Sequence, residues 1–241
     1  MRSVLEMIKY RLHIFFKRHL YVMPMVVLAL FDGFCFSLKP VHPITGMIML
    51  CFVLFLIMVW TGWMIMEKED PVEEQLLQLR VVRKRSYYMG KCLFLLAVGL
   101  IFAVFALAVP MLLSVQPIGG VFSRPVTVGD LAQAFLLLLG CSCCGIALGG
   151  LLSFQVMRDR KFALLLTLLL AVVTVLASTL KKYAVVGWFM WLLPPVSDIA
   201  EVYVSCEYFQ PGQTTILFAA MVFYGILYLL VHSALCYKRG F

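Results

Sequence analysis

The sequence predicts an all-α, polytopic membrane helical bundle, and three observations support that fold class. Of the 241 residues, 63% are hydrophobic and only 13% are charged, whereas soluble domains average about 45–50% apolar and about 25% charged residues. The apolar residues form uninterrupted blocks of the roughly 20-residue length that crosses a bilayer as a helix. Runs such as 162–170 do not alternate between apolar and polar side chains, which excludes a transmembrane β-barrel.

Six segments are predicted to span the membrane, within a single transmembrane domain that covers residues 1–241. The predicted spans are 20–38, 44–66, 92–114, 130–154, 162–180 and 213–236. An even number of spans places both termini on one side. Most lysines and arginines fall on that side, and the exceptions are Lys39, Arg124, Lys181 and Lys182. Because cytoplasmic loops are enriched in Lys and Arg, both termini are predicted to be cytoplasmic.

The net charge of +8 is explained by this topology, with attraction to anionic lipid as a second contribution. Nucleic acid is therefore not an expected partner. In the fourth predicted span, Gly145 and Gly149 fit the small-xxx-small pattern of close helix contact.

Residues 1–19 are predicted to form an amphipathic helix before the first span. Its apolar residues are Val4, Leu5, Ile8, Leu12, Phe15 and Phe16. Its polar residues are Arg2, Glu6, Lys9, His13 and Lys17. Such a helix lies in the plane of the membrane interface. Two interpretations remain open: a general interfacial anchor, or an elbow helix that holds the cytoplasmic end of a transport domain and contacts a soluble partner.

The first predicted span contains one carboxylate, Asp32, about seven residues before Lys39. Seven residues of helix cover about 10 Å, so Asp32 is expected near the outer interface. A carboxylate inside a membrane is a functional candidate by default, which makes Asp32 a candidate residue of a substrate pathway. The alternative is a structural residue whose carboxylate reaches water.

The longest polar stretch, residues 67–91, lies on the predicted cytoplasmic side between the second and third spans. Asp70 suits an N-cap, Pro71 suits the first helical position, and acidic residues favour the positive end of the helix dipole. Those acidic residues are Glu73 and Glu74. An apolar stripe at helical spacing consists of Val72, Leu76 and Leu79. A helix this short is not stable alone, so it is expected to pack on another surface.

Acidic residues, two leucines, an arginine and a Gly-Lys pair follow one another in this stretch. They are Glu67, Glu69, Glu74, Leu76, Leu77, Arg83, Gly90 and Lys91. In this order they resemble the cytoplasmic loop of permease subunits of type-2 ABC exporters, the ABC2-type membrane protein family. The sequence departs from the family pattern at Pro71-Val72, where Gly-Thr is common, and at 80–82, where Pro-x-Ser is common. An elbow helix, six spans and a long outer segment extend the resemblance over nearly the whole chain.

The resemblance implies a permease subunit of an ATP-binding cassette exporter in a bacterial plasma membrane. It implies a separate ABC ATPase subunit, which holds ATP and Mg²⁺, and a second permease copy. Contact with the ATPase is assigned by the resemblance to Glu73, Glu74, Leu76, Leu77, Leu79 and Arg83. A pathway with few charges suits an amphipathic or hydrophobic substrate, such as a lipid, a peptide, a drug or a lipid-linked saccharide.

The outer segment 181–213 contains an apolar stretch with two tryptophans and two prolines that is too short to cross a bilayer. In the family resembled, re-entrant helices at this position cap the outer end of the pathway. An ordinary interfacial belt of aromatic residues is the alternative.

No catalytic motif is present, so the chain is predicted to be a transporter subunit, not an enzyme, with no cofactor or metal of its own. Gly90-Lys91 is followed by Cys92 and lacks the upstream glycine of a phosphate-binding loop. The cysteines at 141–144 lack the second ligand pair of a zinc site. The main alternative is a secondary transporter or channel driven by an ion gradient, and a membrane-embedded enzyme or an assembly scaffold is a third possibility.

Overall fold

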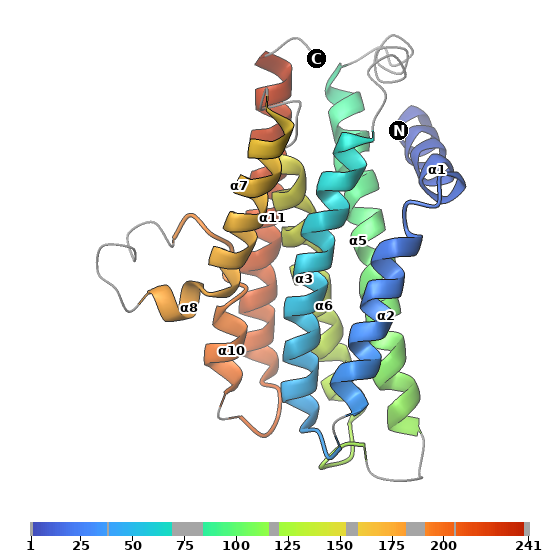
Figure 1. The fold of residues 1–241 in the computed structure, drawn as a ribbon. Helices are drawn as coiled ribbons and strands as arrows, with labels where there is room; N and C mark the ends of the chain where they lie inside the picture. The colour runs from blue at the N-terminus through green and yellow to red at the C-terminus, as the bar shows by residue number, and fades with distance from the viewer. Residues whose placement is uncertain are drawn as a thin grey trace.

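The structure is a computed structural model that describes residues 2–37, 39–68, 84–115, 121–152, 159–181, 191–204 and 206–238. In these ranges every regular element is a helix (Figure 1). The helices are α1 (Arg2–Lys17), α2 (Val22–Ser37), α3 (Pro43–Glu67), α5 (Lys84–Val115), α6 (Val128–Leu151), α7 (Arg160–Val175), α8 (Ala177–Leu180), α10 (Asp198–Tyr203) and α11 (Pro211–Lys238). The all-α prediction is confirmed for the described residues.

Helices α3 and α6 form the centre of the bundle. They share the most extensive helix–helix contact, and α6 also packs on α11 and α5. The most apolar window of α6 is 78% buried and that of α3 is 67% buried, against 39% for α5 and 33% for α11. The central position explains why α6 carries no charged residue after Asp130, since a charge in an apolar interior is costly without a partner.

Glycines bring the backbones of α3 and α6 into direct contact. A Cβ atom at Gly149 would lie 2.1 Å from the carbonyl oxygen of Val59, and one at Gly145 would lie 2.6 Å from that of Phe55. From the α3 side, a Cβ at Gly62 would lie 2.5 Å from the carbonyl oxygen of Ile146. The predicted close contact at Gly145 and Gly149 is confirmed, because only hydrogen at Cα leaves room for these carbonyls.

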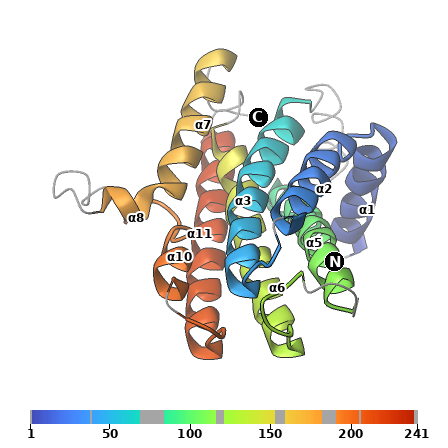
Figure 2. The same ribbon diagram turned by 60° about the horizontal axis from the view of Figure 1, so that its bottom comes forward.

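The other helices surround this pair on two sides. Helices α1, α2 and α5 lie on one side, and α7, α8, α10 and α11 lie on the other (Figures 1 and 2). One end of the bundle, which we call the basic end, contains helix α1, the Glu67 end of α3, the Arg160 end of α7 and the Lys238 end of α11 (Figure 1). The opposite end, with the turn between α2 and α3 and residues 121–127, is called the far end.

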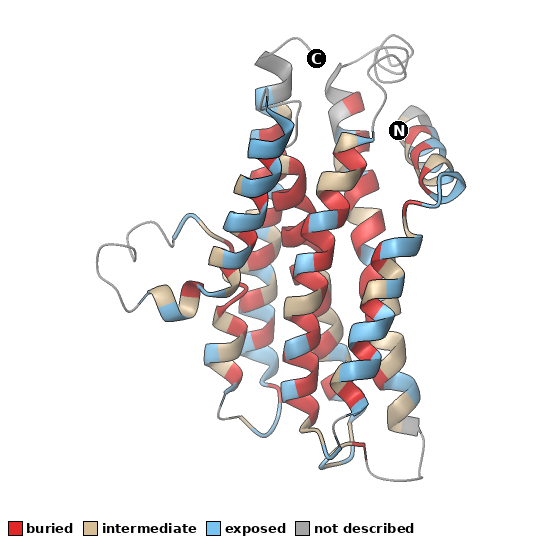
Figure 3. Ribbon diagram, viewed as in Figure 1, coloured by how far each residue is buried: buried red, intermediate tan, exposed pale blue. Residues whose placement is uncertain are grey.

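Large apolar side chains of the outer helices are exposed, as the pale blue faces of α2 and α7 show in Figure 3. On α7 they include Phe162, Leu165, Leu168 and Leu169. Continuous exposed apolar surface on several long helices is what lipid contact requires. The long apolar helices indicate a multi-pass membrane protein.

The described residues hold fewer full-length spans than the six predicted. Four helices, α3, α5, α6 and α11, are long and apolar enough to cross a membrane, and a fifth span is counted if α1 and α2, bent by 72°, are taken together. Helices α2 and α7 have 16 residues each, or about 24 Å of helix, less than the roughly 30 Å of bilayer hydrocarbon. The predicted span 162–180 is interrupted at Leu176.

Helix α1 forms over most of the predicted range 1–19, and its buried face overlaps the predicted apolar face in part. The buried side chains of α1 are Met7, Arg11 and Phe15. Of the predicted apolar residues, Phe15 is buried, Val4, Ile8 and Leu12 are half-buried, and Leu5 and Phe16 are exposed. The buried face includes Arg11, whose partner Tyr87 lies on α5. The turn into α2 passes through His19 with φ of 52°, a left-handed conformation that permits the sharp bend.

Candidate functional site

At the basic end, α1 and the turn that follows it contact both helix ends that flank the segment 69–83. Arg18 Nη1 donates a hydrogen bond of 3.2 Å to the carbonyl oxygen of Lys68, at the end of α3. Arg11 Nη2 donates one of 2.8 Å to the hydroxyl of Tyr87, near the start of α5, and its guanidinium lies 5.4 Å from the centre of that ring. Such a contact over an aromatic face adds cation–π attraction. Helix α1 and the turn after it therefore contact the Glu67 end of α3 and the Lys84 end of α5.

The contact between α1 and α5 is close as well as polar. A Cβ atom at Gly90 would lie 3.0 Å from Sδ of Met7, so the glycine lets α1 approach the α5 backbone. Arg11 is 8% exposed and Lys91 is 3% exposed. Buried cationic groups need partners, and those of Arg11 include Tyr87.

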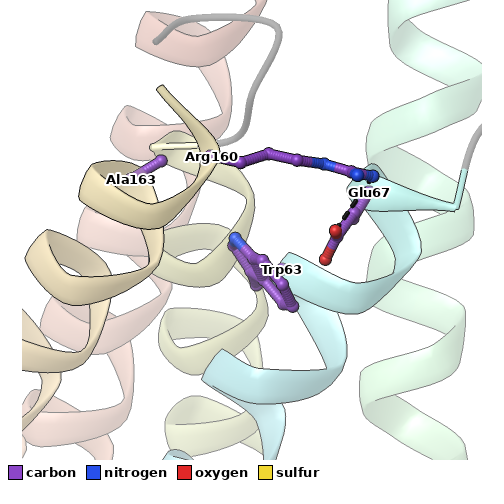
Figure 4. Close-up of a pocket in the computed structure, with 4 residues that line it drawn as sticks. All are labelled: Trp63, Glu67, Arg160 and Ala163. Atoms are coloured by element: carbon purple, nitrogen blue, oxygen red, sulfur yellow. Dashed lines mark ion pairs between the residues drawn. The ribbon is translucent and has the colours of Figure 1, made fainter. Parts of the chain in front are cut away.

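An ion pair joins α3 to α7 at the same end. Arg160 Nη2 lies 2.9 Å from Oε1 of Glu67, and the arginine side chain extends from α7 across to α3 (Figure 4). Trp63, one helical turn before Glu67, and Ala163 on α7 line the space beneath the pair (Figure 4). The arginine side chain is 63% exposed, so water weakens this attraction and its contribution to stability is about 0–1 kcal/mol.

The residues predicted to contact an ATPase lie outside the described residues. These are Glu73, Glu74, Leu76, Leu77, Leu79 and Arg83. The described parts of the predicted motif are Glu67, which pairs with Arg160, and Gly90-Lys91, which packs against α1. The structure thus places the two ends of the motif on a common platform of α1, α3 and α5.

Asp32 is fully buried on α2, on the same face as Leu28 and Phe36. Neither carboxylate oxygen has a hydrogen-bond partner among the described residues. The expectation that Asp32 reaches water near the interface is therefore wrong in this structure, because α2 packs this face onto α3 and α5. A buried carboxyl without a partner is stable only when it is protonated or when a cation arrives. Asp32 remains a candidate pathway residue.

A polar cluster that the sequence reasoning did not identify closes the far end of α6. Arg124 binds Asp130 through both Nη atoms, at 2.8 and 3.2 Å, and Asp130 forms a reciprocal capping box with Thr127. The Asp130 carboxylate raises the pKa of Arg124 above its ordinary value. The guanidinium also lies 4.3 Å from the ring centre of Tyr208, just before α11. The spacing Thr-x-x-Asp is the sequence pattern from which this capping box could have been predicted.

Between α7 and α11 the chain leaves helical conformation beside the middle of α11. The hydroxyl of Tyr224 donates to the carbonyl oxygen of Trp191 at 2.5 Å, and that of Tyr228 donates to Leu192 at 2.6 Å. Non-helical backbone at membrane depth persists only where its polar groups are satisfied, and two tyrosines of α11 satisfy these carbonyls. In the same region Asp198 forms a partly exposed ion pair with Lys181.

Comparisons with known proteins do not assign a family. No family model matches the chain, and no curated protein matches it either. Within the described residues, no group of three or more His, Cys, Asp or Glu side chains is arranged to hold a metal ion.

Proposed function

We propose that the chain is the membrane-spanning permease subunit of an ATP-binding cassette exporter of the type-2 class, with six spans and both termini in the cytoplasm of a bacterium. The observation that carries the proposal is the segment 67–91. Its residue order resembles the coupling loop of that family, and the two helix ends that flank it accept hydrogen bonds from Arg11 of α1 and from Arg18 in the turn after α1.

This arrangement supports a specific mechanical role. A partner that pushes on residues 69–83 acts directly on the ends of α3 and α5. Helix α3 is locked to α6 through backbone contacts at Gly145 and Gly149, so the two central helices would move as one unit. Packed helices shift between discrete arrangements and do not deform continuously. Closure of two ATPase subunits would thereby alternate the access of a pathway between two permease copies.

The substrate class follows from the apolar character of the bundle. An amphipathic or hydrophobic cargo, such as a lipid, a peptide, a drug or a lipid-linked saccharide, needs few charged groups along its path. ATP and Mg²⁺ would be held by the partner ATPase, since this chain lacks a phosphate-binding loop. Glu67 and Arg160 pair at the basic end, which is the end that would face that partner in this proposal.

The test is ATP hydrolysis by the tagged chain, purified in mild detergent from its native membranes with whatever subunit accompanies it. We expect vanadate-sensitive hydrolysis that is lost in Leu76→Asp, because a charge on the apolar stripe disrupts docking. The matched control is Gln78→Asp, which adds the same charge without removing an apolar contact. Absence of an ATPase from several mild detergents, or equal activity of both variants, would contradict the proposal.

A second candidate function is an ion-driven transporter or channel, and Asp32 is the observation that favours it. A carboxyl that is 0% exposed and has no hydrogen-bond partner for either oxygen within the described part of the chain is a group that could take up and release a proton in a transport cycle. The test is proton flux into liposomes that contain the chain alone, driven by a pH gradient. This candidate predicts flux that is abolished in Asp32→Asn, and an absence of flux in the unmodified chain excludes it.

A further inference from the structure

A pocket of about 370 Å³ lies where the helical path is interrupted beside α11. Helix α7 ends at Val175, α8 turns the chain aside (Figure 1), and the chain is back against α11 at Trp191. Tyr224, which contacts Trp191, is about 20 Å along α11 from Pro211, and the whole helix of 28 residues is about 42 Å long. The pocket therefore lies about halfway along α11.

The pocket is lined by charged and by apolar side chains. Lys181 and Asp198 are the charged ones and form an ion pair, and the hydroxyl of Ser197 donates to Asp198 at 3.2 Å. Aromatic and proline side chains also line the pocket; among them are Trp191, Tyr224 and Pro194. A volume of this size falls within the usual range of small-ligand sites, about 300–1,000 Å³.

The charges of this pocket indicate what it can bind. Because Lys181 and Asp198 compensate each other, an anionic or a cationic ligand would leave one of the two without an opposite charge. A ligand that carries both a phosphate and an ammonium group matches both side chains at once. The ring of Trp191, which also lines the pocket, is an aromatic face that could add cation–π attraction for the ammonium group.

The surroundings indicate that the ligand also has apolar chains. Trp191 is 70% exposed and its neighbour Leu192 is 54% exposed, so the pocket borders apolar surface of the kind that faces lipid. A polar headgroup inserted here would leave its chains along that surface. The Lys181–Asp198 pair is itself partly exposed, so a headgroup can reach both charged side chains.

We propose that this pocket binds the headgroup of a zwitterionic phospholipid, with the phosphate on Lys181 and the ammonium group on Asp198. The proposal does not depend on ATP-driven transport, since it concerns equilibrium binding by the purified chain. In this proposal, the interruption of the helical path between α7 and α11 binds a ligand in addition to its structural role.

The experiment measures quenching of Trp191 fluorescence by brominated lipid. In a chain with Trp60, Trp63 and Trp188 replaced by Phe, Trp191 is the only remaining tryptophan. The purified chain in maltoside micelles is titrated with dibrominated phosphatidylethanolamine or dibrominated phosphatidylglycerol at equal mole fractions. We expect saturable quenching by the zwitterionic lipid at a roughly threefold to tenfold lower mole fraction than by the anionic lipid.

Two single variants then test the orientation of the headgroup. Asp198→Asn leaves Lys181 without its opposite charge and should shift the preference towards phosphatidylglycerol. Lys181→Gln should weaken the binding of both lipids, and that of the anionic lipid more. Glu201→Gln is the matched control, because Glu201 is an exposed acidic residue of the same helix outside the pocket lining.

In the single-tryptophan chain that keeps Lys181 and Asp198, equal quenching by the two lipids would overturn the proposal. This result needs none of the charge variants. An equal shift in Asp198→Asn and Glu201→Gln would also overturn it, because the shift would then reflect overall charge and not this pocket.

Discussion

The contact between α3 and α6 at Gly149 yields the sharpest stability prediction, for the substitution Gly149→Ala. The new Cβ would lie 2.1 Å from the carbonyl oxygen of Val59 and 3.0 Å from the backbone nitrogen of Trp63. An ordinary van der Waals contact begins at about 3.4 Å. The helices must therefore separate locally by about 1.3 Å, which is the difference between 3.4 Å and the 2.1 Å to the carbonyl oxygen of Val59. The obstacle is backbone, which cannot rotate away as a side chain would.

The magnitude follows from two opposing terms. Overpacking of a core costs about 1–3 kcal/mol and sometimes more, whereas alanine is about 1 kcal/mol more favourable than glycine within a helix. Because the clash involves rigid backbone on both helices, we expect the upper end of the first range. The net loss of unfolding free energy is then about 2 kcal/mol.

The neighbouring Gly150 supplies the matched control. A Cβ there would meet nothing closer than the Cε of Met66 at 3.6 Å, so Gly150→Ala should be neutral or stabilising by up to about 1 kcal/mol. Both variants are compared with the unmodified chain by SDS titration in mixed micelles, with helix content followed by circular dichroism. If Gly149→Ala were as stable as Gly150→Ala, the locked α3–α6 pair would be refuted.

Three further substitutions test other contacts in the same titration. Arg124→Gln removes the bidentate partner of the buried Asp130 and should lower the free energy of unfolding by about 3 kcal/mol. Arg124→Lys should have an intermediate effect. If Arg124→Gln were as stable as the unmodified chain, the ion pair would contribute nothing to stability. Asp32→Leu replaces a buried unpartnered carboxyl and should raise the unfolding free energy by about 1–3 kcal/mol, so a loss of stability would mean that Asp32 makes a contact in the membrane. Tyr228→Phe leaves the carbonyl of Leu192 without its donor and should cost about 1–3 kcal/mol, which an unchanged midpoint would contradict.

Much of the central packing could be predicted because it depends on local composition. The long apolar blocks identified α3, α6 and α11 within a few residues of their observed ends, and α5 at its end but not at its start, which lies eight residues before the predicted span. The spacing of Gly145 and Gly149 identified a contact face, since two glycines one turn apart expose backbone on one side of a helix.

The candidate site was less accessible to sequence reasoning, as Arg11 illustrates. By periodicity Arg11 is an interruption of an apolar face, and its burial became understandable only when Tyr87, 76 positions away, proved to be its partner. The interruption of the predicted span 162–180 is similar. The sequence around Leu176 is apolar, and hydropathy does not report that the chain finds hydrogen-bond donors on α11 once it leaves the helix.

By itself, the sequence determined that this chain is helical, apolar and asymmetric in charge, because transfer free energy, helical period and charge are properties of neighbouring residues. Only the tertiary structure decided which faces are buried, that Asp32 has no hydrogen-bond partner among the residues the structure describes, and that Lys181 meets Asp198 in a pocket. These outcomes depend on atoms brought together from distant parts of the chain. A buried polar group is stabilised or destabilised by the groups beside it in space, and no local pattern encodes that proximity.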